Sequence, residues 1–128
     1  MERLILSAMP VVSQELALRY LLELSTDIRV ALLHEPGGDL LAAAPERPAE
    51  RALDASRALV REAQVASEAD GDAEIDIRLE RGTVFLVREE GHVLVCVTGP
   101  LALPGLILHD MRIVLSDLAR EASGREAK

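Results

Sequence analysis

The feature that most restricts the fold is a pair of consecutive strand-like segments that are apolar on both faces. Residues 83–88 (TVFLVR) and 92–98 (HVLVCVT) are separated only by a short turn through Glu89, Glu90 and Gly91. A turn this short makes neighbouring strands antiparallel. Because both faces of these strands are apolar, other elements must cover both sides of the sheet. The sequence therefore predicts a sheet with helices on each face.

The remaining segments supply the other strands and the helices. A glycine turn, Glu35 to Asp39, joins two strands, and strict alternation of apolar and charged residues marks a further strand. Apolar residues at helical spacing mark three helices. The predicted order is helix 11–24, strands 28–34 and 39–44, helix 49–68, strands 74–80, 83–88 and 92–98, and helix 106–122. This order makes an α+β fold, α/β/α in three layers, with a five-stranded antiparallel sheet.

The length fits a single domain. With 128 residues, the chain can bury roughly two-thirds of its unfolded surface in one core. We expect one domain over residues 1–128, with flexible ends at 1–9 and 123–128. In the first helix, the apolar stripe recurs every four residues, at Val12, Leu16, Tyr20 and Leu24, and is widened by Leu18, Leu21 and Leu22.

Composition excludes several classes of function. Asp and Glu number 22 against 14 Lys and Arg, so the formal net charge is −8 at pH 7. Such a surface repels phosphates, and we expect no nucleic-acid partner. Lys128 is the single lysine, which excludes a P-loop or a Schiff-base lysine. The single cysteine excludes an intramolecular disulfide and a multi-cysteine zinc site, and no cofactor is expected.

The sequence also indicates a compartment. It contains no uninterrupted apolar run of roughly 18 residues, so we expect no membrane span. Glu2 and the short apolar run Leu4–Leu6 do not make a secretory signal. One thiol and no glycosylation sequon fit a reducing, cytoplasmic location. Abundant Arg and Ala beside one Lys and no Asn hint at a GC-rich bacterial gene.

Candidate catalytic and metal-binding side chains each have a simpler interpretation. His34, His92 and His109 lack partners at metal-ligand spacing, so we expect turn and surface histidines rather than a metal site. Cys96 lies between two valines, and we expect a buried, unreactive thiol.

The turns have equally simple interpretations. The pairs Glu89-Glu90 and Asp70-Asp72 lie in predicted turns, where carboxylates are normally solvated and lack the burial that acid–base catalysis requires. Gly37-Gly38 precedes a strand rather than a helix, and so forms a turn rather than a phosphate cradle.

The second helix and the strand after it carry the candidate dimer interface. The helix has small residues along one side and further apolar residues on others, more than packing on its own sheet requires. Strand 74–80 points its apolar residues to one side, and its charges to the other. The predicted interface residues are Ala52, Ser56, Leu59, Ala63, Ala66, Ile75, Ile77 and Leu79. Packing against the chain's own sheet is the alternative for part of this set.

Two arginines on the same helix are candidates for partner contacts. Arg57 and Arg61 lie four residues apart on one face, so both could contact an acidic partner. The alternative is a solvated face with local pairing to Asp54 and Glu62.

The order and lengths of these elements resemble the roadblock/dynein light-chain family. The resemblance covers about Pro10 to Glu121 and rests on the hairpin VALLHEPGGDLLAA, the helix ERALDASRALVREAQVASEAD, the strand pair RGTVFLVREEGHVLVCVTG and a leucine-rich last helix after LPGLI. Ala31 and Asp39 fit the family pattern, whereas His34 and Pro36 depart from it.

The resemblance implies a function without catalysis. Members of this family are dimeric platforms that regulate or anchor small Ras-like GTPases, or attach cargo to motors. They usually pair through the long second helix and the neighbouring edge strand. We therefore expect a homodimer that binds a small GTPase and is not an enzyme.

Three other functions remain open from the residues alone. One is a scaffold or adaptor without a GTPase. Another is a GAF- or PAS-like small-molecule sensor, although Tyr20 and Phe85 are the only aromatic residues that could line its cavity. A small enzyme is the third, and the scarcity of candidate catalytic residues disfavours it.

Overall fold

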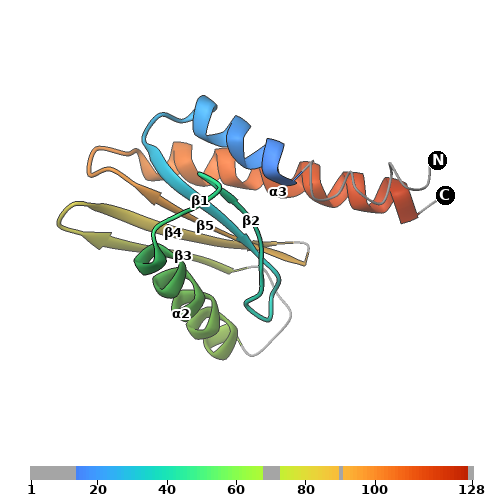
Figure 1. Ribbon diagram of the computed structural model, residues 1–128, viewed down its shortest axis with the longest axis horizontal. Helices are drawn as coiled ribbons and strands as arrows, with labels where there is room; N and C mark the ends of the chain where they lie inside the picture. Colours follow the sequence, from blue (N-terminus) through green and yellow to red (C-terminus); the bar gives the residue numbers. More distant parts are fainter. Residues whose placement is uncertain (1–13, 68–72, 90, 127–128) are drawn as a thin grey trace.

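The computed structural model describes residues 14–67, 73–89 and 91–126, which form three layers (Figure 1). A five-stranded antiparallel sheet lies in the middle, in the order β2-β1-β5-β4-β3. The helix at 14–24 and α3 (Pro104–Glu126) cover one face, and α2 (Glu50–Ser67) covers the other. The predicted α+β class, antiparallel sheet and element order are confirmed.

The strands that are apolar on both faces lie inside the sheet. The five strands are β1 (Ile28–His34), β2 (Leu40–Ala44), β3 (Ala73–Leu79), β4 (Gly82–Glu89) and β5 (His92–Thr98). β5 pairs with β1 on one side and β4 on the other, and its Cys96 lies opposite Phe85. β2 and β3 form the two edges. All five strands begin and end within one residue of the predicted positions.

Each face of the sheet has its own core. The side chains that helix 14–24 and α3 bury against one face are Leu18, Leu21, Ile107, Met111, Val114, Leu115 and Leu118. The core under α2 is smaller and contains Leu32, Ala43, Val60, Ala63, Leu86, Val93 and Val95. Burial of one large apolar side chain contributes about 1.5–3 kcal/mol. The two cores therefore hold the helices on opposite sides of the sheet.

The apolar stripe predicted for the first helix is buried in one part and exposed in the other. Leu18 and Leu21 are fully buried, whereas Leu16 and Tyr20 are both 56% exposed and Leu24 is 49% exposed. A spacing of four residues drifts about 40° per step around a helix with 3.6 residues per turn. The line of residues at every fourth position therefore turns away from the sheet, whereas Leu18 and Leu21, which widen the predicted stripe, meet the core. Val12 lies outside the described residues.

The last helix is longer than predicted. α3 begins at Pro104 and continues to Glu126, beyond the predicted end at Ala122. No proline follows Ala122, and a glycine inside a helix costs only about 1 kcal/mol, so Gly124 does not end it. The predicted flexible end at 123–128 is thus helical as far as Glu126. The other predicted flexible end, 1–9, lies outside the described residues.

Candidate functional site

The candidate site is the face built by α2 and the edge strand β3. The structure divides the predicted interface residues by exposure. Ser56 and Ala63 are both 2% exposed within the single chain, because they pack between α2 and its own sheet. Ile77 and Leu79 are 39% and 61% exposed. The half-buried members are Ala52, Leu59 and Ile75. The side chain of Ala66 lies outside the described part of the chain. Because Ile77 and Leu79 are the most exposed of the predicted residues, the interface prediction now rests mainly on β3.

β3 presents an apolar strip beside an unpaired backbone edge. It pairs with β4, and no strand in the described part of the chain pairs with its other side. Ile75 packs on the core under α2, and alternate residues of a strand share a face. Ile77 and Leu79 therefore continue this strip beyond the cover of α2. An exposed edge of this kind is a template for another strand.

The outer side of α2 carries the two candidate arginines. Arg57 and Arg61 are both exposed. Neither forms an ion pair with another residue that the structure describes, so the alternative pairing with Asp54 and Glu62 is not observed there. Both guanidinium groups are accessible to a partner from the solvent side of α2.

A histidine and a serine meet inside this face, a contact that the sequence did not reveal. The expectation of a surface or turn position for His34 is wrong, because the ring is fully buried at the end of β1. Its Nε2 lies 3.0 Å from Oγ of Ser56, and its Nδ1 lies 3.0 Å from the carbonyl oxygen of Gly38. The alternation of the strand could have indicated this burial, because His34 shares a face with Val30 and Leu32, which pack in the core under α2.

The environment of His34 keeps its ring neutral. Burial lowers the pKa of His34, the hydrogen bond to the Gly38 carbonyl opposes this effect, and the nearby charge of Arg57 lowers it further. A serine beside a neutral histidine resembles the nucleophile and base of covalent catalysis. Here both side chains are closed off from solvent, so the pair connects the hairpin to α2 rather than presenting Ser56 to a substrate.

The remaining candidate residues are not assembled into a site. Cys96 is fully buried, as predicted, and burial raises the pKa of its thiol. Among the residues that the structure describes, no group of three or more His, Cys, Asp or Glu is placed to hold a metal ion. His109 is exposed and His92 is half-buried. No described helix is long and apolar enough to cross a membrane.

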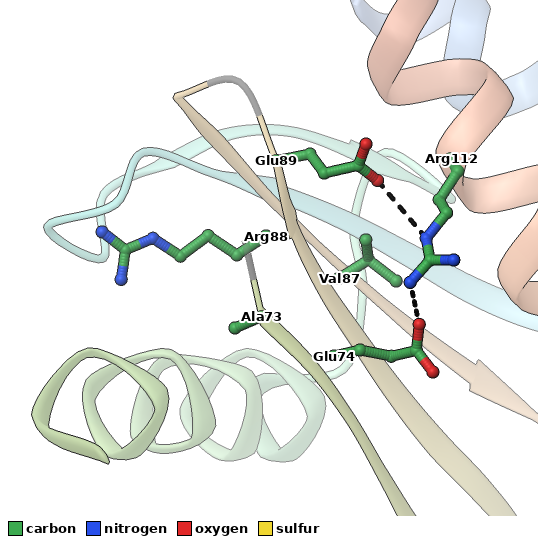
Figure 2. Close-up of a pocket in the computed structure, with 6 residues that line it drawn as sticks. All are labelled: Ala73, Glu74, Val87, Arg88, Glu89 and Arg112. Carbon is green, nitrogen blue, oxygen red and sulfur yellow. Dashed lines mark hydrogen bonds and ion pairs between the residues drawn. The ribbon is translucent and has the colours of Figure 1, made fainter. Parts of the chain in front are cut away.

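A charged cluster ties α3 to the edge strand on the opposite face. Figure 2 shows Arg112 reaching from α3 to Glu74 on β3 and Glu89 on β4, while Arg88 points away. The Nε atom of Arg112 lies 3.4 Å from Oε2 of Glu89, so Glu89 is a paired strand residue and not the solvated turn residue predicted. The cluster lines a hollow of about 400 Å³. Arg112 pairs with both carboxylates, so the cluster stabilises the position of β3 relative to α3.

Comparison with known proteins identifies the fold. No protein-family model and no curated protein matches the chain. The Roadblock/LC7 domain from Streptomyces avermitilis matches with a TM-score of 0.73 and 13% identity, over 85% of this chain and 97% of that one. The gliding protein MglB from Thermus thermophilus matches with a TM-score of 0.73 and 22% identity, over 90% and 92%. An MglB with a tetrameric arrangement matches with a TM-score of 0.72 and 24% identity, over 90% and 91%. The chain therefore has the Roadblock/LC7 fold.

Proposed function

We propose that this Roadblock/LC7-fold chain is a homodimeric platform that binds and regulates a partner protein, with a small Ras-like GTPase as the first candidate. The observation that carries the proposal is the apolar strip of Ile75, Ile77 and Leu79 beside the unpaired edge of β3. The platform presents a surface and supplies no catalytic residue.

A second copy of the chain fits the edge of β3. Two β3 strands that meet antiparallel about a two-fold axis would satisfy each other's free backbone groups. If the axis passes at Ile77, Ile75 lies opposite Leu79 of the other copy, and Asp76 lies opposite Arg78. Apolar and opposite-charge pairs are the favourable cross-strand combinations. An axis at Asp76 would instead place two aspartates directly opposite each other.

Support for self-association and for the kind of partner comes from two sources. The MglB with a tetrameric arrangement is a protein of this fold that self-associates. The resemblance to the roadblock family implies regulation of small GTPases. In the dimer, Arg57 and Arg61 would be exposed on α2 next to the paired edges, where they can contact carboxylates of a bound partner. The chain's charge of −8 becomes −16 in the dimer, which favours a basic patch on the same partner.

The proposal that the platform is not an enzyme rests on the burial of its candidate nucleophiles and on the lack of an internal lysine. Ser56 and Cys96, the candidate nucleophiles of the described core, are closed off from solvent. Lys128 is the only lysine, so no internal lysine can reach a nucleotide phosphate. The GTPase therefore has to supply the nucleotide site.

The test mixes the protein with Ras-like GTPases from its own genome. Each is loaded with GDP or a non-hydrolysable GTP analogue, and binding and the rate of GTP hydrolysis are measured. We expect at least one to bind, and Arg57→Ser with Arg61→Ser to weaken that binding. Arg19→Ser, an exposed arginine on the other helix layer, is the matched control. If the dimer binds none of them, the GTPase assignment is wrong and a scaffold role replaces it.

A further inference from the structure

Helix 14–24 and α3 lie on the side of the sheet opposite α2 (Figure 1), and both carry exposed apolar side chains. Leu16 and Tyr20 are both 56% exposed and Leu24 is 49% exposed, at spacing i, i+4, i+8 along one side of helix 14–24. On α3, Leu106 and Ile113 are 54% and 40% exposed. We name these five residues the helix-layer patch. The outer side of a surface helix is ordinarily polar, so a patch of this kind marks an interaction site.

A groove runs between the two helices at this patch. Its volume is about 260 Å³, and its lining consists of Leu16, Ala17, Tyr20, Val114, Asp117, Leu118 and Glu121. Small-molecule pockets usually measure roughly 300–1,000 Å³. The smaller volume and the largely apolar lining suit one or two side chains of a protein partner.

Acidic residues lie beside the apolar ones on the α3 side of the groove. Leu106, Ile113 and Asp117 follow at spacing i, i+7, i+11, which places them along one side of the helix. Because Asp117 lines the groove, this exposed side of α3 borders the groove. Glu121 lies one turn further along the same lining. The groove therefore has an apolar floor and two carboxylates on its α3 side, and Arg120, outside the lining, forms an ion pair with Asp117.

We propose that the helix-layer patch binds an amphipathic helix of another protein, with apolar residues at i, i+4 spacing and Arg or Lys beside them. Helices commonly lay an apolar stripe into such grooves. Charge complementarity favours such a partner, since the Glu121 carboxylate forms no ion pair with another described residue and the chain carries a net charge of −8. Asp117 adds a second carboxylate, which pairs with the exposed Arg120 when no partner is bound. A second copy of this chain would carry the same net negative charge. The proposal does not rest on the GTPase assignment, because the patch lies across the sheet from α2.

The test is a displayed library of amphipathic helical peptides of about 20 residues, long enough to form stable helices. The library varies acidic, basic and neutral residues beside a fixed apolar stripe, and it is selected against the full chain. We expect the selected peptides to be enriched in Arg and Lys. Fluorescence anisotropy then measures their affinity for the protein and its variants.

Two double variants examine the patch directly. Leu16→Ser with Tyr20→Ser should weaken peptide binding about tenfold or more, because exposed Tyr and Leu would act as the central anchors. Both side chains are half-exposed, and circular dichroism verifies that the variant remains folded. Asp117→Asn with Glu121→Gln should remove most of the salt dependence of binding, because that dependence comes from screened charges.

Leu79→Ser is the matched control, since Leu79 is 61% exposed on the other side of the sheet. Leu79→Ser should leave peptide affinity unchanged and weaken the proposed dimer. The Leu16→Ser, Tyr20→Ser variant should weaken peptide binding and leave the dimer unchanged. No enrichment, enrichment of acidic or neutral peptides, or binding insensitive to the Leu16 and Tyr20 changes would overturn the proposal. A fall in the mass of the protein alone on changing Tyr20 would identify a second copy as the occupant instead, and would equally overturn it.

Discussion

The Nε2 atom of His34 lies 3.0 Å from Oγ of Ser56, and this contact joins the end of β1 to α2. On the other side of the ring, Nδ1 lies 3.0 Å from the carbonyl oxygen of Gly38. A carbonyl can only accept, so Nδ1 carries the proton and the Ser56 hydroxyl donates to Nε2 of the neutral ring. The same hydroxyl also lies 3.0 Å from the carbonyl oxygen of Leu53. Its single proton is therefore shared between two acceptors, Nε2 of His34 and this carbonyl oxygen. The hairpin and α2 are thus connected through one histidine in one protonation state.

This connection predicts a pH dependence of stability. The pKa of His34 in the folded chain is below its ordinary value of 6.5, mainly because the ring is buried. As the pH falls below about 6.5, the unfolded chain takes up a proton that the folded chain does not bind. The free energy of unfolding should therefore fall, and this contribution should level off once the folded state is protonated as well.

Urea denaturation between about pH 7.5 and 5.5, the range in which histidines titrate, measures the effect. The wild-type chain should lose more stability over this range than His34→Gln. His109→Gln, at an exposed histidine, controls for the loss of a histidine in general. Equal slopes for the wild-type chain and His34→Gln would show that the ring does not control this pH dependence.

The serine should contribute to stability in its own right. Ser56→Ala removes the hydroxyl that donates to His34 and leaves Nε2 buried without a partner. The expected loss is about 1–3 kcal/mol, the cost of an unsatisfied buried polar group. Ser116→Ala, on the exposed side of α3, should change the free energy of unfolding by less than about 0.5 kcal/mol. Similar effects for both variants would mean that the His34–Ser56 contact is not formed in solution.

The turn between β3 and β4 requires a glycine at its end. A Cβ added at Gly82 would overlap the carbonyl oxygen of Thr98, a backbone atom of the neighbouring strand. Gly82→Ala should therefore destabilise the protein by about 1–3 kcal/mol, a typical cost of overpacking. Gly37→Ala is the control, since no atom lies within 4 Å of a Cβ there. Thermal unfolding of the two variants compares them, and equal melting temperatures would contradict the close approach at Thr98.

Local sequence patterns are sufficient to place the strands of this fold. Residues 83–88 and 92–98 are apolar on both faces, and strands of this type require cover on both sides. Short glycine turns make the neighbours antiparallel. Both signals act over a few residues, and for this reason the predicted strand boundaries lie within one residue of those in the structure.

The contacts that could not be predicted join residues far apart in the chain. Nothing near His34 in the sequence indicates that Ser56 will meet it, and nothing near Glu89 indicates Arg112. The side of helix 14–24 that faces the sheet could not be predicted for a related reason. Its leucines occupy most sides of the helix, so the shape of the sheet decides which of them are buried. For the same reason, the exposed helix-layer patch could not be predicted from the sequence.

The proposed register of the dimer can be tested by disulfide trapping. With the two-fold axis at Ile77, Ile77→Cys places two thiols directly opposite each other, within the roughly 7 Å between Cα atoms that a disulfide allows. Leu79→Cys residues would be offset by four positions, about 13 Å along the strands. We expect oxidation to link Ile77→Cys efficiently and Leu79→Cys poorly, as read on a non-reducing gel. Preferential linking of Asp76→Cys would instead place the axis at Asp76.

Sedimentation equilibrium at micromolar concentration tests the central claim, a dimer formed through the edge of β3. The wild-type chain should have twice the mass of a 13.9 kDa monomer. Ile77→Asp should give the monomer mass and remain folded by circular dichroism, because Ile77 is already 39% exposed in the single chain. Two aspartates would then face each other at the axis, where like charges destabilise strand pairing. A monomeric wild-type chain, or a dimer that survives Ile77→Asp, would contradict the account.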